Sequence, residues 1–137
     1  MSDLIEGLQE ARDGLKNKDW RKTQGILRQL FPTSGNNKFI GDLLRAGLGA
    51  QKNGEIAQAE ILFWLAIDIY ESGRDENAEV LTAIQLLADM YKKGDRPADM
   101  QNLCDKTFLT VLGAAEGLHR SIKSLTKQLN DSERASR

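Results

Sequence analysis

The sequence contains very little of what enzymes use for catalysis. Among its 137 residues there is one histidine, His119, and one cysteine, Cys104. No pair of side chains suggests a nucleophile with a base beside it, so we expect no catalytic residue. A zinc site would need several carboxylates in addition to these two residues, and we expect no metal and no cofactor.

The helical pattern around these two residues also favours structural roles. Cys104 falls on an apolar stripe that continues to Val111, which predicts a buried structural thiol. His119 is expected at the surface or rim of the next apolar stretch. A single cysteine excludes a disulfide within the chain, which fits a reducing compartment.

Long apolar runs and an excess of one charge are missing too. No stretch is long enough to cross a bilayer, and the first residues lack the basic and apolar segments of a secretory signal. The 19 basic and 20 acidic residues leave a formal net charge of −1, so the chain as a whole does not attract nucleic acid or membranes. We therefore expect a cytoplasmic protein with no membrane partner.

Prolines and aromatic residues are scarce, and the residues that replace them favour helices. Apolar side chains recur three and four positions apart, most clearly in residues 54–71, where Ile56, Ala59, Phe63, Ala66 and Tyr70 form a stripe. This periodicity predicts an all-α protein. The helices are expected at 3–16, 20–31, 38–52, 55–72, 76–93 and from about 97 onward, the last one long and interrupted at 113–117.

Tight turns recur at regular distances between these helices. Lys18-Asp19, Gly54-Glu55 and Gly94-Asp95 are 36 and 40 residues apart. Such a period is typical of stacked helical hairpins, in which each hairpin covers the apolar face of its neighbour. We predict stacked antiparallel hairpins in a single domain over residues 1–131, with a polar tail at 132–137.

The best-formed hairpin carries a recognisable pattern. Gly47 precedes the Gly54-Glu55 turn, and Ile56, Ala59, Phe63 and Ala66 follow it. This stretch resembles the tetratricopeptide repeat (TPR) family, which has a small residue, a Gly-Asp-like turn, a large apolar residue, alanine, an aromatic residue and alanine at these places.

The resemblance covers about residues 43–95. Residues 77–95 are similar to the longer-period TPR variant of kinesin light chains. After the Gly94-Asp95 turn the pattern departs from the family, because Arg96 stands where a large apolar residue is expected.

The TPR resemblance implies a right-handed array with a groove lined by the first helix of each hairpin. Such a groove holds a peptide or helix of another protein, so the resemblance implies a non-catalytic adaptor or chaperone. The residues expected to contact the partner are polar and lie off the apolar stripes of their helices: Arg45, Gln51, Lys52, Thr82, Gln85, Asp89 and Lys92.

A second hypothesis concerns the C-terminal part of the chain. Leu118, Ile122, Leu125 and Leu129 recur at spacings of 4, 3 and 4, which is a heptad pattern. Such a pattern predicts an oligomer interface and a structural or assembly role.

Charged residues are unevenly placed and leave further alternatives open. Residues 55–79 are acidic, whereas 18–28 and 118–137 are basic. These segments are compatible with ordinary solvated helix faces, or with an acidic surface that meets a basic partner or another copy. Association with nucleic acid is a weaker alternative, because the basic segments lack interleaved aromatic residues beyond Trp20. For the fold, the alternative is an unrelated helical bundle.

Overall fold

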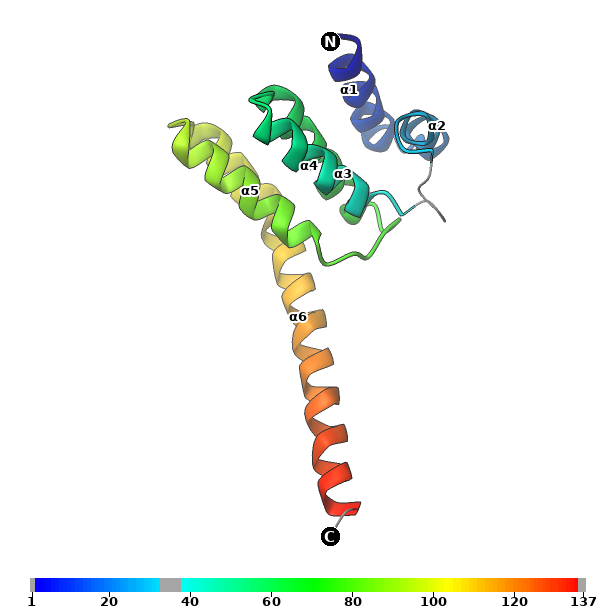
Figure 1. The fold of residues 1–137 in the computed structure, drawn as a ribbon, viewed down its shortest axis with the longest axis vertical. Helices are drawn as coiled ribbons and strands as arrows, with labels where there is room; N and C mark the ends of the chain where they lie inside the picture. Colours follow the sequence, from blue (N-terminus) through cyan, green and yellow to red (C-terminus); the bar gives the residue numbers. More distant parts are fainter. Residues whose placement is uncertain (1, 33–37, 136–137) are drawn as a thin grey trace.

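The structure, a computed structural model, describes residues 2–32 and 38–135, except the side chains of residues 2, 3, 114, 115, 117–119, 121 and 133–135. Over these residues all regular structure is helical. The helices are α1 (Ser2–Lys16), α2 (Trp20–Leu30), α3 (Ile40–Lys52), α4 (Ile56–Glu71), α5 (Val80–Lys93) and α6 (Pro97–Ala135). They pair as the hairpins α1/α2, α3/α4 and α5/α6 (Figure 1). The predicted all-α class and the long C-terminal helix are confirmed.

The same turn closes each of the three hairpins. One residue has a left-handed backbone, with φ of 60° at Lys18, 80° at Gly54 and 52° at Asp95. The next residue donates its backbone N–H to the carbonyl five positions back, at 2.7, 2.8 and 2.9 Å. This bond is that of the Schellman motif, which ends a helix. The third turn therefore lies one residue later than the prediction from Gly94, and Asp95 takes the position that Gly54 has in the second.

Two aspartates act as helix caps. Asp19 accepts the backbone N–H three residues later, at 3.3 Å, at the start of α2. Asp75 is 4% exposed and accepts the backbone N–H of Ile40 at 3.3 Å, so it caps α3 from a distant loop. It also accepts the N–H of Asn77 at 3.1 Å. Because such local bonds compete with helix formation, α5 begins at Val80 and not at residue 76 as predicted.

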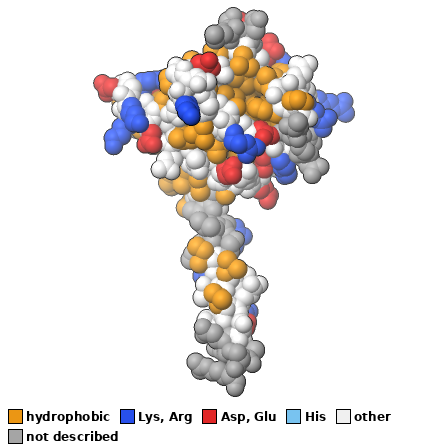
Figure 2. Space-filling view, viewed as in Figure 1, with side chains coloured by type: hydrophobic (Ala, Val, Ile, Leu, Met, Phe, Trp, Pro, Cys, Tyr) orange, Lys and Arg blue, Asp and Glu red, His pale blue; other side chains and the backbone are white. Residues whose placement is uncertain are grey.

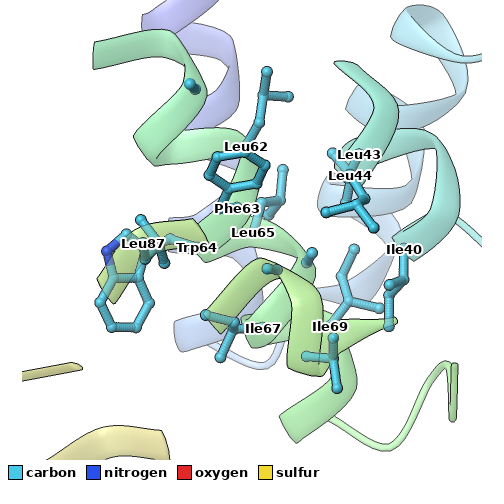
Figure 3. Close-up of a cluster of buried hydrophobic side chains, with 14 of the residues drawn as sticks. Ile40, Leu43, Leu44, Leu62, Phe63, Trp64, Leu65, Ile67, Ile69 and Leu87 are labelled. Carbon is cyan, nitrogen blue, oxygen red and sulfur yellow. The ribbon is translucent and has the colours of Figure 1, made fainter. Parts of the chain in front are cut away.

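α4 is the central helix of the core and packs against α1, α3 and α5. Its buried residues cover every side of the helix (Figure 3): Ala59, Leu62, Phe63, Trp64, Leu65, Ala66, Ile67 and Ile69. A helix that is apolar all round is typical of a buried one. The predicted single stripe was too narrow, and it was wrong for Ile56, which is 43% exposed.

α3 approaches α4 closely at Gly47. A Cβ atom added to Gly47 would collide with the ring of Phe63, whose Cδ1 atom would be 2.8 Å away. Gly49, two residues later on the exposed side of the same helix, would meet nothing within 4 Å. The absence of a side chain at Gly47 therefore allows α3 to pack closely on α4.

The first hairpin joins the rest of the body through α1, which packs against α4. Arg12 donates to Asp68 at 2.7 Å, and its guanidinium lies 5.2 Å from the ring centroid of Trp64. Within the hairpin, Thr23 donates its hydroxyl proton to the carbonyl of Ala11 at 2.7 Å. α4 thus binds helices from both neighbouring hairpins.

α6 begins at Pro97, as predicted, and its C-terminal part projects from the body (Figure 1). Its 39 residues correspond to a length of about 58 Å at 1.5 Å per residue. The predicted interruption at 113–117 was wrong, because these residues are helical. Each glycine there costs only about 1 kcal/mol of helix propensity, and the residues around it are good helix formers. Residues 132–135, predicted as tail, are helical, and residues 136–137 lie outside the described chain.

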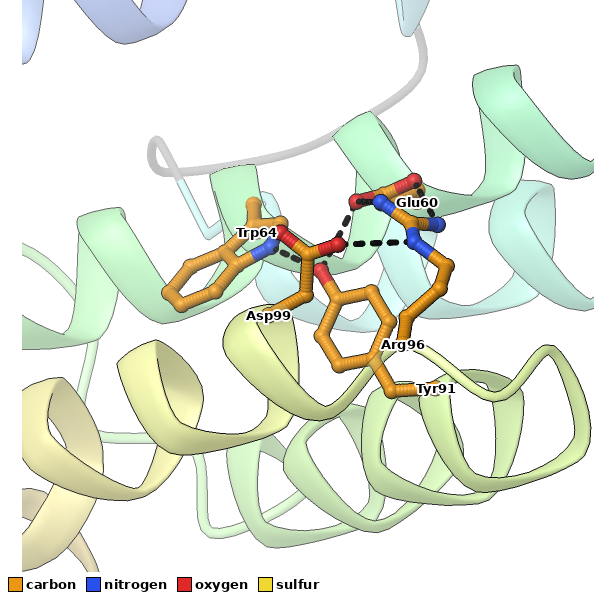
Figure 4. A network of polar contacts seen from close by, with 5 residues as sticks. All are labelled: Glu60, Trp64, Tyr91, Arg96 and Asp99. Carbon is orange, nitrogen blue, oxygen red and sulfur yellow. Dashed lines mark hydrogen bonds and ion pairs between the residues drawn. The ribbon is translucent and has the colours of Figure 1, made fainter.

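A polar network fastens α4, α5 and the start of α6 together (Figure 4). Arg96 donates to both carboxylate oxygens of Glu60 at 3.0 Å, and to Asp99 at 2.8 Å. Tyr91 donates its hydroxyl proton to Glu60 at 2.8 Å and accepts one from the indole of Trp64 at 2.8 Å. The arginine that departs from the TPR pattern therefore anchors the third hairpin to α4.

Candidate protein-interaction surfaces

The residues predicted to line a groove lie on α3 and α5, which contact each other. Gln51 is half-buried, and Arg45 forms an ion pair with Asp42 on its own helix. Six of the seven side chains are exposed, as the periodicity predicts: Arg45, Lys52, Thr82, Gln85, Asp89 and Lys92. Their role in binding a partner stays a prediction.

A polar cleft of about 320 Å³ opens between α1, α4 and α6. Arg12, Lys16, Asp68, Glu71 and Lys106 are among its lining residues, and none of the predicted groove residues is. Glu71 accepts a hydrogen bond from Thr110 at 3.1 Å. Burial raises the pKa of Glu71, and this hydrogen bond opposes the shift. With Arg12 and Asp68 paired across it, the cleft acts as a polar junction between helices.

The network around Glu60 has perturbed protonation equilibria that suit a structural role. Burial raises the pKa of Tyr91 to about 12, and the hydrogen bond from Trp64 opposes the shift. The hydrogen bonds from Arg96 to Glu60 raise the pKa of the guanidinium further above its usual range. Both groups keep their protons at neutral pH, which suits a network that holds helices together.

The acidic segment at 55–79 is largely engaged within the chain. Glu60 binds Arg96, Asp68 binds Arg12, and Glu71 accepts from Thr110, while Asp75 caps α3. Glu60, Asp68 and Asp75 are buried or half-buried, so they contribute little to the acidic surface that the charge pattern alone suggested, whereas Glu71 is exposed.

Apolar side chains are exposed on the described part of the projecting helix α6 (Figure 2). Ile122, Leu125 and Leu129 are 53%, 59% and 67% exposed, in agreement with their prediction as surface residues of a seam. The side chain of Leu118 lies outside the described residues. Nearer the body, four more apolar side chains are exposed: Phe108, Leu109, Val111 and Leu112.

The exposed residues near the body extend the heptad pattern. Seven positions are separated alternately by three and four residues, and we call them the α6 seam: Phe108, Val111, Ala115, Leu118, Ile122, Leu125 and Leu129. Only the last four were predicted, because Val111 was expected on the buried stripe of Cys104. Val111 is 40% exposed. The uninterrupted alternation of spacings was the signal that could have revealed the whole seam.

The side of α6 that faces the body is different from the seam. Leu103, Thr107 and Thr110 are the buried positions there. Thr107 donates its hydroxyl proton to the carbonyl of Leu103 at 2.6 Å, and Thr110 donates to Glu71, so both hydroxyls are satisfied in the core. Cys104 lies off this face and is exposed, so the predicted buried thiol was wrong.

The charged residues of the projecting part whose side chains are described lie away from the seam. At 100° per residue, they fall on the opposite side of the helix. These exposed residues are Glu116, Arg120, Lys123, Lys127 and Asp131. The positions beside the seam are neutral at Thr126 and Gln128, so its apolar strip has no charged border there.

Other kinds of site find no support in the part of the chain that the structure describes. It contains no cluster of three or more potential metal ligands. None of its helices combines the length and apolarity needed to span a membrane. The side chain of His119 lies outside the described residues.

Comparisons with protein-family models, with curated proteins and with solved structures each found no match. The TPR resemblance therefore stays a prediction from the residues that carry it. The function has to be argued from the surfaces of the chain itself.

Proposed function

We propose that this chain is a non-catalytic protein–protein interaction module that binds another protein through the α6 seam. One observation carries the proposal: the seam positions continue over three heptads on a helix that projects from a body with its own core, and each of them whose side chain is described is apolar and exposed. Contiguous exposed apolar surface marks sites of interaction. Alternating spacings of three and four suit a helical partner, whose side chains pack between those of the seam.

The groove between α3 and α5 is the second candidate. Its support is the exposure of six polar side chains on two adjacent helices. TPR-like packing, a role as adaptor or chaperone for a bound peptide, and a cytoplasmic location belong to this proposal. We rank it below the seam because solvated polar residues are common on any helical surface, whereas a long exposed apolar strip is not.

Two adjacent substitutions in the full chain test the seam. Leu125→Glu places a charge in the seam, and Ser124→Glu places the same residue outside it. We expect Leu125→Glu to release proteins that co-purify with the tagged wild-type chain from its native host, and Ser124→Glu to retain them. Far-UV circular dichroism of both variants checks that the fold is unchanged. Equal retention by the two variants would show that the seam is not the binding surface.

A charge-reversed variant tests the groove separately. It combines Lys52→Glu, Asp89→Lys and Lys92→Glu, all on exposed positions. Loss of co-purified protein from this variant, with full retention by Leu125→Glu, would favour the groove over the seam. Partners that stay bound after charge reversal exclude the predicted groove.

A further inference from the structure

We propose that the protein bound by the α6 seam is a second copy of this chain, with the two α6 helices parallel and in register. This inference rests on the proposed function, since it names the occupant of the same surface.

The residues of the seam fit a pair of parallel helices. In a heptad labelled a to g, the seam occupies positions a and d, with Phe108, Ile122 and Leu129 among the a positions. Ile122 stands between two d positions, Leu118 and Leu125. A β-branched residue at a with leucine at d favours two parallel strands.

The charge distribution allows two copies to meet. Coiled coils select foreign partners mainly through charges at the e and g positions beside the seam. Here those positions include Thr126 and Gln128, while Lys123 and Lys127 lie on the far side. At these two positions two copies therefore bring no like charges together across the seam, and no charge there favours a different partner.

The body of the molecule does not obstruct such a pair. Its contact with α6 is centred on Leu103, Thr107 and Thr110, which lie roughly 100° around the helix from Phe108 and Val111 at 100° per residue. A two-fold axis along the paired helices places the two bodies on opposite sides. Leu112 is exposed beside the seam near the body and adds to the contact.

The size of the contact predicts a weak dimer. Residues 108–129 extend about 33 Å at 1.5 Å per residue, and a second helix that covers about a third of the circumference removes about 500 Å² from each copy. The total of about 1,000 Å² is at the lower limit for a specific interface. We expect a dissociation constant on the order of 1–100 μM.

Cys104 makes the register measurable. It is exposed and lies one heptad before Val111, so it occupies a d position on the same face. In a parallel pair in register, each Cys104 faces its counterpart, and a disulfide can form only between copies because the chain has no other cysteine. In an antiparallel pair with full overlap, Cys104 lies opposite Leu129.

The first experiment measures self-association of the purified full chain by sedimentation equilibrium, from about 1 to about 200 μM. We expect a monomer–dimer equilibrium. Leu125→Glu should raise the dissociation constant at least about 100-fold, because two buried charges would meet no partner. Ser124→Glu should leave it within about threefold of wild type.

The second experiment measures disulfide formation under copper–phenanthroline, with oxygen as the acceptor of the two electrons and two protons. We expect Cys104 to link two copies rapidly. The Cys104→Ser/Leu125→Cys variant, whose thiol lies three heptads further along the seam, should also link rapidly. The Cys104→Ser/Ser124→Cys variant, with its thiol outside the seam, should link slowly. Non-reducing gel electrophoresis shows the covalent dimers.

Each other outcome overturns a defined part of the inference. A monomer at every concentration excludes a second copy as the occupant and leaves the proposed function to its own co-purification test. A dimer that survives Leu125→Glu overturns the inference, because the two copies would then associate through another surface, and it leaves the proposed function to the co-purification test. The antiparallel arrangement is tested with a mixture of the wild-type chain and the Cys104→Ser/Leu129→Cys variant. If disulfides form between these two proteins and not between two wild-type chains, the helices are antiparallel and the parallel arrangement is overturned.

Discussion

Replacing Gly47 with alanine tests the close approach of α3 to α4. The added Cβ atom would collide with the ring of Phe63, with Cδ1 at 2.8 Å. Phe63 is fully buried, so its ring has no solvent to move into. Overpacking of this kind costs about 1–3 kcal/mol, whereas alanine gains up to about 1 kcal/mol over glycine in helix propensity. The net effect of Gly47→Ala is therefore a loss of up to about 2 kcal/mol.

Gly49→Ala provides the matched control. It lies on the same helix and gains the same propensity, but its Cβ atom would meet nothing within 4 Å. The difference in unfolding free energy between the two variants isolates the collision, and we expect about 1–3 kcal/mol in favour of Gly49→Ala. Urea unfolding followed by far-UV circular dichroism measures this difference, with unchanged denaturant dependence as the sign of an intact two-state transition.

A third variant shows where the strain arises. Phe63→Leu leaves more room opposite position 47, so the cost of Gly47→Ala should be smaller in the Phe63→Leu background than in the wild type. Such coupling is expected only for residues in contact. If Gly47→Ala is as stable as Gly49→Ala, or if the two substitutions are additive, the packing of α3 on α4 is not as described.

Three further predictions concern the polar network and the turns. Glu60→Ala should lower the free energy of unfolding, measured in urea, by roughly 1–2 kcal/mol, because Arg96 and Tyr91 lose the carboxylate that they bind. A loss under about 0.3 kcal/mol would contradict this prediction. Burial raises the pKa of Tyr91 from 10.0 to about 12, so the unfolded chain loses this proton first and stability should fall as the pH rises through that range. Tyr91→Phe should remove that part of the pH dependence, and an unchanged profile would show that another group causes it. Lys18→Gly should raise the thermal midpoint, because glycine adopts a φ of 60° without strain, whereas Lys16→Gly within α1 should lower it.

The helices and their ends could be predicted because local chemistry decides them. Asp19 caps α2, Gly54 supplies a left-handed residue, and Pro97 begins α6, all through contacts within a few residues. The third turn was placed one residue early because glycine is the usual left-handed residue, and here Asp95 adopts that conformation.

The packing between hairpins could not be predicted in the same way. Asp75 caps α3 across 35 positions of sequence, and Arg12 reaches Asp68 on α4 across 56. The periodicity of a helix shows which face is apolar but not which distant helix covers it. The acidic character of residues 55–79 was therefore assigned to the surface, although Asp68 and Asp75 serve contacts within the fold.

The C-terminal half of the candidate seam could be predicted from the sequence, and the half near the body could not. Leucines and isoleucine at heptad spacing identified Ile122, Leu125 and Leu129 directly. Near the body the pattern is ambiguous, because the buried positions there include threonines, which the apolar periodicity ignores. Thr110 is buried while Val111 beside it is exposed, and only the contact with Glu71 explains this inversion.

The continuity of α6 sets both the length of the projecting part and the direction in which its end points. From Thr110 to Ala135 the helix is unbroken and carries whatever lies at its far end about 38 Å from the body. An unbroken helix also transmits rotation, at 100° for every residue inserted or removed. An insertion of seven residues between 131 and 135 would therefore move the chain end about 10 Å outward with little rotation, whereas an insertion of two would turn it almost to the opposite side. The number of residues in α6 therefore fixes the direction in which the end of the helix points. A flexible linker of the same length would not fix that direction.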